Sequence, residues 1–478
     1  MTRILSVASE CAPFVKTGGL ADVVGALPRA LAAYGDEVRT LVPGYPALMK
    51  RARKAKTVAS FKGFFGGSAK ILAVTLDGVD LLVLEAKHLF DRAGGPYVDA
   101  DGLDWPDNPE RFAALCYAAA AIAVEGADGW VPQAVHGHDW QAGLIPEYLH
   151  ELQPGGARTP FVMTVHNIAF HGNAGADRLK ALRLDPWRLR QEHFEFWGLI
   201  SALKAGLTGA DRITTVSQTY AEELMTPEFG MGMDGVLRAR RGDLVGIVNG
   251  IDTDVWNPET DPAIQTYKTP KGKQANKTAL RAEFGLGEAE GPLCVLVSRL
   301  TEQKGIDLLL EALPSLLARG GQLALLGSGD KGLEAALQDL AAREPNVGVK
   351  IGYDEPQAHR MMAGGDAILV PSRFEPCGLT QLYGLRYGTV PLVALTGGLA
   401  DTVINASPAA LARGVATGIQ YFPVTGEALA NAFTRLCDLY DDPKTWTTIQ
   451  RNGMKQPVGW ESSAAKYHNL YADLVGAA

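Results

Sequence analysis

The sequence is poor in cysteine, and its cysteines are not spaced to bind a metal. Only 5 of the 478 residues are Cys, they lie far apart, and none forms a Cys-x-x-Cys motif. An odd, scattered set of this kind is typical of reduced intracellular thiols rather than of a disulfide framework. His, Cys, Asp and Glu do not gather at metal-ligand spacing either. We therefore expect a cytoplasmic protein with no bound metal and no cofactor.

Long apolar runs are also missing. The longest, Phe112 to Val124, falls short of the ~20 residues that a membrane-spanning helix requires, and its many alanines predict a buried helix. Near the N-terminus, the apolar stretch from Ile4 to Ala8 is shorter than the ~7–15 residues of a signal-peptide core. The sequence thus predicts neither a membrane span nor a secretory signal.

An excess of positive charge is absent as well. The 45 Lys and Arg residues are outnumbered by 53 Asp and Glu, which gives a net charge of −8. Proteins that bind nucleic acids or anionic membranes through their overall charge carry the opposite balance. We expect no nucleic-acid partner and no membrane partner. An acidic small molecule would need a local cluster of cations.

What is present indicates a globular α/β protein of two or three domains. Short runs rich in Val, Ile and Leu alternate with amphipathic helical patterns. The runs lack polar alternation, as do parallel strands that are covered on both faces. The predicted strands include Ile4–Ser9, Glu37–Val42, Phe161–Val165, Arg212–Val216, Cys294–Ser298, Leu323–Leu326 and Ala367–Val370. We predict Rossmann-like, doubly wound domains.

One break divides this series of strands and helices. Residues 226–243 are rich in Gly and Met without a clear period, and residues 257–277 are polar and predict a loop. A fresh series begins near Leu293. We therefore place an N-terminal domain at 1–245 and a C-terminal domain at 246–457.

The end of the chain has a pattern of its own. Residues 458–478 follow Pro457, and the pattern from Trp460 to Leu474 predicts a helix. We expect this segment to dock on the N-terminal domain.

A short fragment occurs once in each predicted domain. Residues 17–24 read TGGLADVV and residues 396–403 read TGGLADTV, so seven of eight positions are identical. Each copy follows a strand and opens a helix, where free N–H groups and the helix dipole favour an anion. For one copy alone, a tight glycine turn before a helix is an equal explanation. The repetition favours two related folds that face each other across a cleft.

The cations that could meet an acidic ligand stand at predicted strand ends. Lys16 precedes the first Gly-Gly turn, and Arg299 and Lys304 follow the strand that ends at Ser298. Ligands of open α/β sheets bind outside the carboxyl ends of strands, where these residues could hold a phosphate. Glu375, in a loop after another strand, could accept hydrogen bonds from sugar hydroxyls. The alternative is that it complements the dipole of the helix that follows.

Two histidines also end predicted strands. His166 follows Val165, and His138 stands next to Asp139 at the end of an earlier strand. His166 could donate a hydrogen bond to a sugar hydroxyl or stabilise charge that develops at a reacting carbon. A histidine satisfied within the core is the alternative.

Together these residues resemble the bacterial glycogen synthases and plant starch synthases, which are retaining glucosyltransferases of the two-domain GT-B architecture. The motifs run in family order over almost the whole chain. They are Lys16-Thr17-Gly18-Gly19-Leu20, Phe90-Asp91-Arg92, Gly95-Pro96-Tyr97, Asp107-Asn108, Arg111-Phe112, His138-Asp139-Trp140, His166-Asn167-Ile168-Ala169, Val248-Asn249-Gly250-Ile251-Asp252, Arg299 with Lys304, Glu375-Pro376-Cys377-Gly378-Leu379-Thr380-Gln381 and Thr396-Gly397-Gly398-Leu399.

The resemblance implies transfer of glucose from ADP-glucose to the nonreducing 4-hydroxyl of an α-1,4-glucan such as glycogen, with retention and without a metal. It implies catalytic roles for His166, Glu375, Arg299 and Lys304. The donor-binding residues would be Lys16, Gly18, Gly19, Asp22, Asn249, Tyr353, Cys377, Gly378, Leu379 and Thr380, with Tyr353 stacking on adenine. The acceptor side would comprise Ser9, Glu10, His138 and Asp139.

Other functions remain open at this point. The same chemistry with UDP-glucose differs only in family likeness, and a catalytically silent glucan-binding or regulatory protein could share the scaffold. The intact set of Lys16, His166, Arg299, Lys304 and Glu375 argues against the silent protein. A glucan phosphorylase would need a pyridoxal-phosphate lysine and a much longer chain. The chain departs from the family pattern at Phe170 and His171, and at Val458-Gly459 before Trp460.

Overall fold

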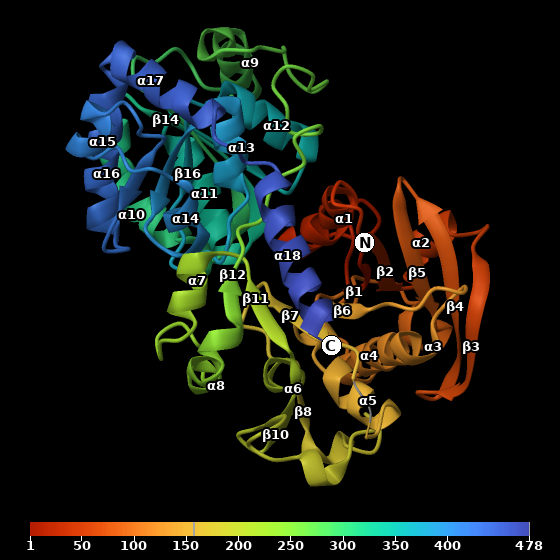
Figure 1. The fold of residues 1–478 in the computed structure, drawn as a ribbon. Coiled ribbons are helices and arrows are strands. Elements are labelled where there is room, and N and C mark those ends of the chain that lie inside the picture. The colour runs from red at the N-terminus through yellow and green to blue at the C-terminus, as the bar shows by residue number, and fades with distance from the viewer. Residues whose placement is uncertain (156–157, 478) are drawn as a thin grey trace. The chain divides into compact units, whose positions relative to one another are not determined.

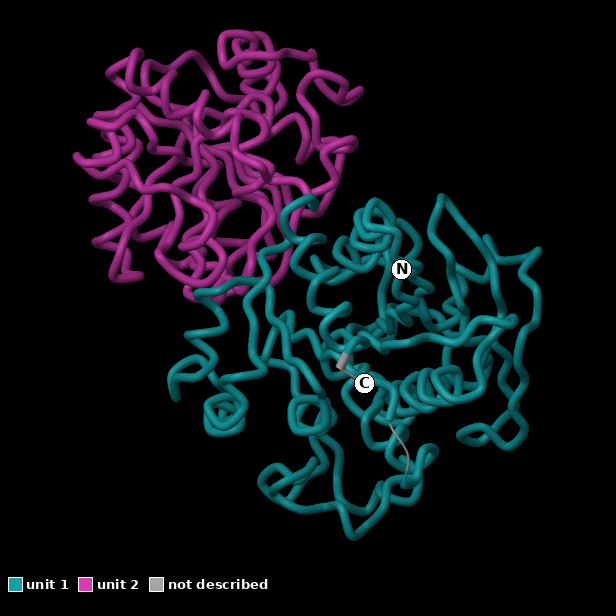
Figure 2. Tube along the Cα trace, viewed as in Figure 1, with its two compact units in different colours: residues 1–249, 460–478 teal, residues 250–459 magenta. Residues whose placement is uncertain are grey.

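The computed structural model describes residues 1–155 and 158–477, so the predicted segment 458–478 is described up to residue 477. The chain forms two compact units (Figure 2). Unit 1 contains residues 1–249 and the C-terminal segment from Trp460, and unit 2 contains residues 250–459. The division falls after Asn249 and after Gly459. The boundaries predicted from the sequence, after residues 245 and 457, lie a few residues earlier.

Unit 1 is built on a nine-stranded sheet (Figure 1). Its strands are β1 (Arg3–Val7), β2 (Glu37–Pro43), β3 (Lys56–Phe64), β4 (Gly67–Leu76), β5 (Val79–Glu85), β6 (Ala134–His138), β7 (Phe161–Val165), β11 (Arg212–Thr215) and β12 (Leu244–Gly246). Their order in space is β12-β11-β7-β6-β1-β2-β5-β4-β3. Neighbours from β12 to β5 are parallel, as predicted. The edge formed by β3 and β4 is antiparallel.

The sequence analysis did not predict this antiparallel edge. Many side chains of β3 are exposed or half-buried, so the strand lacks the continuous apolar run that marks the parallel strands. A small second sheet also belongs to unit 1, in the order β8-β10-β9. Its strands are β8 (Asn173–Gly175), β9 (Glu195–Phe196) and β10 (Leu199–Ser201).

The helices of unit 1 lie between the strands in sequence, except for α18 at the end of the chain. They are α1 (Gly19–Ala32), α2 (Pro46–Arg51), α3 (Lys87–Phe90), α4 (Asn108–Glu125), α5 (Ile145–Leu152), α6 (Ala202–Gly209), α7 (Gln218–Glu223), α8 (Asp234–Ala239) and α18 (Glu461–Ala477), with 3₁₀ turns η1 (Trp140–Ala142), η2 (Ala176–Arg178), η3 (Pro186–Arg188) and η4 (Arg241–Asp243). The predicted buried helix is α4, whose alanines are almost all inaccessible. The Gly- and Met-rich segment 226–243 contains α8 and η4.

Unit 2 contains one parallel sheet of six strands. The strands are β13 (Leu293–Leu300), β14 (Gln322–Gly329), β15 (Val347–Ile351), β16 (Ala367–Val370), β17 (Val390–Ala394) and β18 (Ile419–Tyr421). Their order is β15-β14-β13-β16-β17-β18. Numbered from the first strand of the unit, this is the order 3-2-1-4-5-6 of a dinucleotide-binding Rossmann sheet.

Helices cover both faces of this sheet. They are α9 (Gln274–Glu283), α10 (Ile306–Leu317), α11 (Lys331–Arg343), α12 (Glu355–Gly364), α13 (Thr380–Tyr387), α14 (Gly397–Thr402), α15 (Pro408–Ala412), α16 (Gly426–Tyr440) and α17 (Pro443–Met454), with η5 (Pro270–Lys273) and η6 (Glu302–Lys304). Alternate residues of β13 enter different cores. Leu296 packs in the cluster of α10 and α16, and Val295 in the cluster of α9 and α12. The predicted loop 257–277 is wrong at its end, since η5 and the start of α9 lie there.

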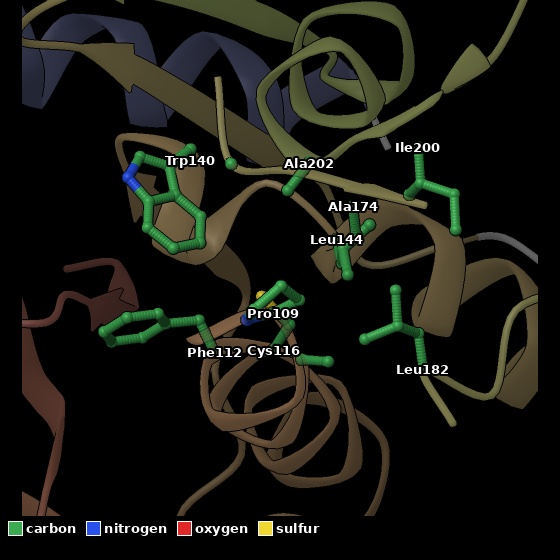
Figure 3. A pocket seen from close by; sticks show the side chains of 11 residues that line it. Pro109, Phe112, Cys116, Trp140, Leu144, Ala174, Leu182, Ile200 and Ala202 are labelled. Carbon is green, nitrogen blue, oxygen red and sulfur yellow. The ribbon is translucent and has the colours of Figure 1, made fainter. Parts of the chain in front are cut away.

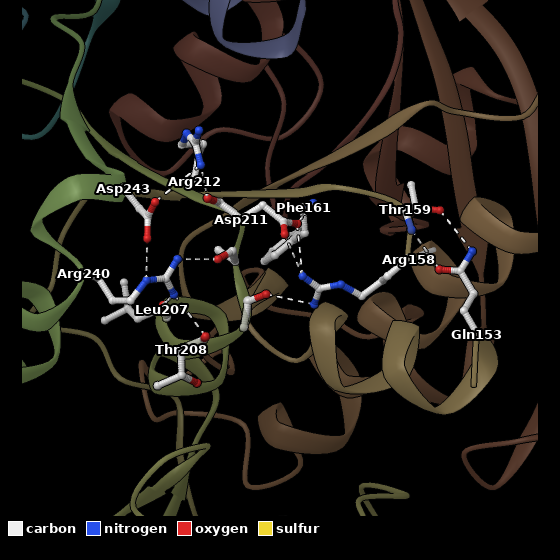
Figure 4. A network of polar contacts seen from close by, with 12 residues as sticks. Gln153, Arg158, Thr159, Phe161, Leu207, Thr208, Asp211, Arg212, Arg240 and Asp243 are labelled. Atoms are coloured by element: carbon white, nitrogen blue, oxygen red, sulfur yellow. Dashed lines mark hydrogen bonds and ion pairs between the residues drawn. The ribbon is translucent and has the colours of Figure 1, made fainter. Parts of the chain in front are cut away.

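A polar network stabilises the amino ends of two strands in unit 1 (Figure 4). The Arg158 guanidinium donates to both carboxylate oxygens of Asp211 at 3.1 Å, and Asp211 also accepts from the backbone N–H of Phe161, the first residue of β7. Arg240 donates to Asp243 and to the carbonyl oxygens of Leu207 and other residues at the end of α6. These contacts lie at the opposite end of the strands from the candidate site.

The C-terminal helix α18 packs within unit 1. Tyr467 and Tyr471 are fully buried in one apolar cluster with Ile4 of β1 and Val23 of α1. The Tyr471 hydroxyl is 2.7 Å from Nδ1 of His136 in β6, and the other ring nitrogen of His136 is 2.6 Å from Oγ1 of Thr164. The sheet and the helix therefore share a buried polar contact inside an apolar interface.

Over the described residues 1–155 and 158–477, each helix is too short or too polar to cross a lipid bilayer.

The contact between α18 and the sheet gives a stability prediction. Tyr471→Phe keeps the ring but removes the hydroxyl partner of His136, so we expect the free energy of unfolding to fall by about 1 kcal/mol. Tyr471→Ala also empties the buried ring volume, and we expect a loss of about 3–5 kcal/mol. Denaturant unfolding of both variants measures the two effects. Equal losses would show that the hydroxyl contact, and not the packing of the ring, anchors the helix.

Candidate functional site

The sheet of each unit has a switch point, a place from which successive strands are added on either side in opposite directions. In unit 1 the chain passes from β1 to β2 on one side and from β6 to β7 on the other. In unit 2 it passes from β13 to β14 on one side and from β16 to β17 on the other. Ligands of open α/β sheets bind outside the carboxyl ends of strands at such switch points. Most of the predicted site residues lie at or after the carboxyl ends of the strands β1, β6, β13 and β16. The exceptions are His166, Asn249 and Tyr353, which follow β7, β12 and β15.

In unit 2 the central element is a buried ion pair. Lys304 Nζ lies 2.5 Å from Oε2 of Glu375, and both side chains are largely inaccessible. The Ser372 hydroxyl donates to the same carboxylate oxygen at 2.8 Å. Lys304 follows β13 and Glu375 follows β16, so the pair spans the switch point of this unit.

The loops that carry this pair are held together by backbone contacts. Arg373 N donates to the carbonyl oxygen of Gln303, and the Arg373 guanidinium forms two hydrogen bonds of 2.7 and 2.6 Å with Asp307. Gly305 has a φ of +67°, and a Cβ there would lie 2.0 Å from the carbonyl oxygen of Pro371. Only glycine permits this approach.

Arg299 differs from the other two predicted cations. Its side chain is exposed, and among the described residues no hydrogen bond or ion pair involves its guanidinium. Lys304 has Glu375 as a partner, and in unit 1 Lys16 Nζ lies 2.8 Å from Asp22. Arg299 is therefore the cation whose charge no neighbouring carboxylate compensates within the described residues.

The start of α13 provides backbone donors at the same edge. Gly378 has a φ of +71° and turns the chain into the helix, which begins at Thr380. Gln381 secures this turn by donating to the carbonyl oxygens of Cys377 and Gly378. The first N–H groups of a helix lack intrahelical partners, so those of Leu379 and Thr380 can face an anion. Cys377 is buried and contributes to packing.

The second copy of the repeated fragment has a different role from the first. Gly398 N donates to the carbonyl oxygen of Glu375 at 3.0 Å, and a Cβ at Gly398 would lie 2.1 Å from the carbonyl oxygen of Cys377. The prediction that this helix start receives an anion is therefore wrong for Gly398, because its N–H already holds the Glu375 loop.

The first copy is open. Gly18 is exposed with an extended backbone, and a Cβ there would meet nothing within 4 Å. Neither packing nor backbone geometry requires glycine at this position, so the space in front of α1 is free for a ligand. Gly19, the first residue of α1, is also exposed, and the Lys16–Asp22 pair stands beside this helix start.

Ser9 and Glu10 are buried and shape the loop that precedes α1. The Glu10 carboxylate accepts hydrogen bonds from the backbone N–H and the hydroxyl of Thr17 and from the Tyr97 hydroxyl, which also contacts Ser9 Oγ at 2.7 Å. Tyr97 is fixed in turn, since its carbonyl oxygen accepts from the Asn108 amide at 2.8 Å. The structure thus places these two predicted acceptor-side residues behind the loop.

The histidines of unit 1 form a connected group. His138 Nδ1 is 3.0 Å from His166 Nε2, and His138 Nε2 is 3.3 Å from Ser6 Oγ. Burial lowers the pKa of His138 and His166 well below the usual value, and lowers that of His136 to about 3. All three imidazoles are therefore neutral at physiological pH.

Asp139 positions the backbone of the loop after β7. Its Oδ1 accepts from the N–H of His166 at 2.7 Å and from that of Asn167 at 3.3 Å. Asp139 itself has a φ of +56°, an uncommon value for a residue other than glycine. Burial raises the pKa of its carboxyl to about 7, against the opposite effect of the two N–H donors.

The two remaining predicted donor residues lie at strand ends. Asn249 is buried after β12, and its side-chain oxygen has no hydrogen-bond partner within the described parts of the chain. Tyr353 follows β15 with its ring 65% exposed, as a stacking surface requires. Sequence reasoning gave no role to Ser6 and Ser372, whose signal is a single polar residue in or after a buried strand. Tyr97 was identified only through the family motif Gly95-Pro96-Tyr97, without its contacts to Ser9 and Glu10.

A different pocket lies between α4 and the region of η1 and β10, and it has none of the charged groups of the candidate site (Figure 3). Its lining is apolar, and it includes Phe112, Trp140 and Leu182 but no charged side chain. Burial raises the pKa of its one thiol, Cys116, to about 12, which makes this group a poor nucleophile. In residues 1–155 and 158–477 no group of three or more His, Cys, Asp and Glu is placed to hold a metal ion.

The environment of Asp139 gives a pH-dependent prediction. A carboxyl whose pKa rises on folding destabilises the folded state progressively as pH rises from about 4 to 7. Asp139→Asn keeps the acceptor oxygen without the charge, so its free energy of unfolding should gain on that of the wild type over this range. Asp139→Ala also loses the acceptor, so it should be about 1–3 kcal/mol less stable than Asp139→Asn at every pH. Denaturant unfolding from pH 4 to 8 measures both, and parallel curves for the Asp139→Asn variant and the wild type would contradict the buried charge.

Comparison with known proteins agrees with this geometry. Residues 3–239 match the family model described as the starch synthase catalytic domain, and residues 279–453 match the model of glycosyl transferases group 1. The chain is 72% identical to a glycogen synthase of Jannaschia sp. (strain CCS1), over 98% of this chain and 99% of that protein. It is 60% identical to a glycogen synthase of Paracoccus denitrificans (strain Pd 1222), with the same coverage.

A solved structure shares the fold over the same extent. The catalytic domain of starch synthase IV from Arabidopsis thaliana, bound to ADP and acarbose, superposes with a TM-score of 0.87 at 31% identity, over 99% of each chain. The two Rossmann-like units are those of the GT-B fold. The family models and the identities over nearly the full length agree with the switch-point sites and show that the chain belongs to the glycogen and starch synthase family of glycosyltransferases.

Proposed function

We propose that this protein transfers glucose from ADP-glucose to the nonreducing 4-hydroxyl of an α-1,4-glucan, with retention at the anomeric carbon, in glycogen synthesis in the cytoplasm. The observation that carries the proposal is the switch point of unit 2. The partly buried Lys304–Glu375 pair, the uncompensated Arg299 and the start of α13 lie at or after the carboxyl ends of the two strands that form it, β13 and β16.

The diphosphate of the donor is the charged part of the substrate. Arg299 would bind it first, because its guanidinium has no carboxylate partner to give up and can grip two phosphate oxygens. Lys304 would share its charge between Glu375 and the diphosphate. The N–H groups of Leu379 and Thr380 add the positive end of a helix dipole. Together they stabilise the charge that grows on the leaving phosphate oxygen.

The sugar would be held by groups of opposite character. The Glu375 carboxylate keeps one oxygen on Lys304 and Ser372 and has acceptor capacity left for glucose hydroxyls. Neutral His166 would donate a hydrogen bond to the sugar, without adding positive charge beside an oxocarbenium-like transition state. Tyr353 would stack on the adenine ring.

Unit 1 would contribute the glycine-lined start of α1 and the Lys16–Asp22 pair. Gly18 and Gly19 leave room for the donor to approach the helix N-terminus. The unpartnered side-chain oxygen of Asn249 would accept a hydrogen bond from a hydroxyl group of ADP-glucose. Ser9, Glu10, His138 and Asp139 would act on the acceptor side by positioning the loops around them rather than by direct contact.

No metal is assigned to this reaction. Arg299, Lys304 and the α13 N-terminus can neutralise a diphosphate, which is the task of a divalent cation in many nucleotide-dependent transferases. The leaving phosphate oxygen is the group that would take the proton of the acceptor hydroxyl.

A donor competition assay tests the proposal. Purified protein should transfer radiolabelled glucose from ADP-glucose to glycogen in the presence of a chelator, and the labelled linkage should be cut by an enzyme specific for α-1,4 bonds. UDP-glucose in excess should compete weakly. Transfer from UDP-glucose alone would overturn the donor assignment. Glucan binding without transfer from either donor would favour a silent glucan-binding protein.

Arg299 allows a sharper test of donor binding. Arg299→Gln removes the uncompensated charge, and we expect the Kd of ADP measured by calorimetry to rise about 10–100-fold. Arg299→Lys keeps the positive charge but loses the paired N–H donors of the guanidinium, and it should have a smaller effect. Arg413→Gln makes the same charge change at an exposed position after α15 and is the matched control. Equal affinities of the two Gln variants would remove Arg299 from the diphosphate site.

A further inference from the structure

A serine in the middle of β1 has no role in the site as described so far. Ser6 is 5% exposed, and its strand neighbours Leu5 and Val7 are fully buried and apolar. Burying a hydroxyl costs free energy unless it forms a hydrogen bond. Among the described residues, the one polar partner of Ser6 Oγ is Nε2 of His138, at 3.3 Å.

The contact between the two histidines requires one shared proton. Both rings are neutral, so each carries one N–H and one bare nitrogen. His138 Nδ1 and His166 Nε2 are 3.0 Å apart, and one of them must donate to the other. If His138 donates, His166 carries its proton on Nδ1, which is free to donate to a ligand. If His166 donates, its Nδ1 is bare and can only accept.

Ser6 distinguishes these two arrangements. When His138 carries its proton on Nδ1, its Nε2 is bare and accepts the Ser6 hydroxyl proton. The donor left over is His166 Nδ1–H, which belongs to a half-buried side chain and can donate to water or to a ligand, so each fully buried donor of the group has an acceptor. When His138 carries its proton on Nε2, that N–H points at the Ser6 oxygen and the Ser6 hydroxyl proton has no acceptor. The first arrangement satisfies one more buried donor.

We infer that Ser6 and His138 are positioning residues that set the tautomer of His166. Ser6 O–H donates to His138 Nε2, His138 Nδ1–H donates to His166 Nε2, and His166 presents Nδ1–H as a hydrogen-bond donor. The Asp139 contact to the His166 backbone holds the ring in place at the end of this chain. The inference rests on the proposed function only in assigning that N–H to the donor sugar.

Nitrogen NMR tests the tautomer without reference to activity. In protein labelled with ¹⁵N-histidine, long-range ¹H–¹⁵N correlations separate protonated from bare ring nitrogens, and the His166 signals are those lost in His166→Gln. We expect wild-type His166 to be protonated on Nδ1. In Ser6→Ala the preference disappears, so both nitrogens should shift to averaged values, while Ser6→Thr should restore the wild-type pattern. A wild-type His166 protonated on Nε2 would overturn the inference.

A second variant keeps the test decisive if Ser6 variants alter packing. An ionised carboxylate can accept a hydrogen bond but cannot donate one, so His138→Asp should move the His166 proton to Nε2. A proton that remained on Nδ1 in this variant would show that His138 does not control it.

Kinetics then connects the tautomer to the reaction. Ser6→Ala should lower kcat about fivefold, the equivalent of one hydrogen bond, with KM for glucan unchanged and recovery in Ser6→Thr. An unchanged kcat together with averaged nitrogen shifts would show that His166 does not donate to the reacting sugar. If wild-type protein transferred no glucose yet showed the Nδ1 proton, the proposed function would fail and the tautomer assignment would stand.

Discussion

One feature of each sheet determines where chemistry can occur in this protein: the point at which the order of its parallel strands changes direction. At the switch points β1/β6 and β13/β16, the connecting loops leave in opposite directions, and the space above the strand ends stays open. Lys304 and Glu375 are 71 residues apart in the chain, yet the pairing of β13 with β16 brings them to 2.5 Å. In unit 1, the pairing of the parallel neighbours β6 and β7 places His138 beside His166. The other contacts of the site refine positions that the sheet order already imposes.

Charge compensation decides how the cations of the site can act. An acidic protein cannot attract a diphosphate through its net charge of −8, so local fields must do so. Two of the three predicted cations carry their own carboxylates, which keeps them oriented and limits the repulsion among like charges. Arg299 alone is uncompensated within the described residues. Under the proposed function, Arg299 is therefore the residue of unit 2 at which the donor diphosphate would attach first.

Polar groups behind the site are as important as those that face it. Glu10 and Tyr97 shape the loop before α1, Asp139 fixes the backbone at His166, and Gly398 holds the loop of Glu375. These groups are buried and satisfy one another, so they cost little stability while they restrict the positions of the reactive side chains. The histidine pair extends this logic from position to protonation, because Ser6 determines which nitrogen of His166 carries the proton.

The sequence by itself determined the class of fold, and it predicted a set of site residues most of which lie at strand ends in the structure. Short apolar runs without alternation are typical of strands covered on both faces, and Phe161–Val165 and Ala367–Val370 were predicted with the bounds that the structure has. Local patterns are enough for such features because they depend on neighbouring residues. Tertiary structure alone decided the antiparallel edge of β3 and β4, the different roles of the two glycine fragments, and the partners of each cation. Those depend on contacts between residues far apart in the chain. Two fragments with seven of eight residues in common can therefore be open at their glycines in one unit and packed against a protein loop in the other.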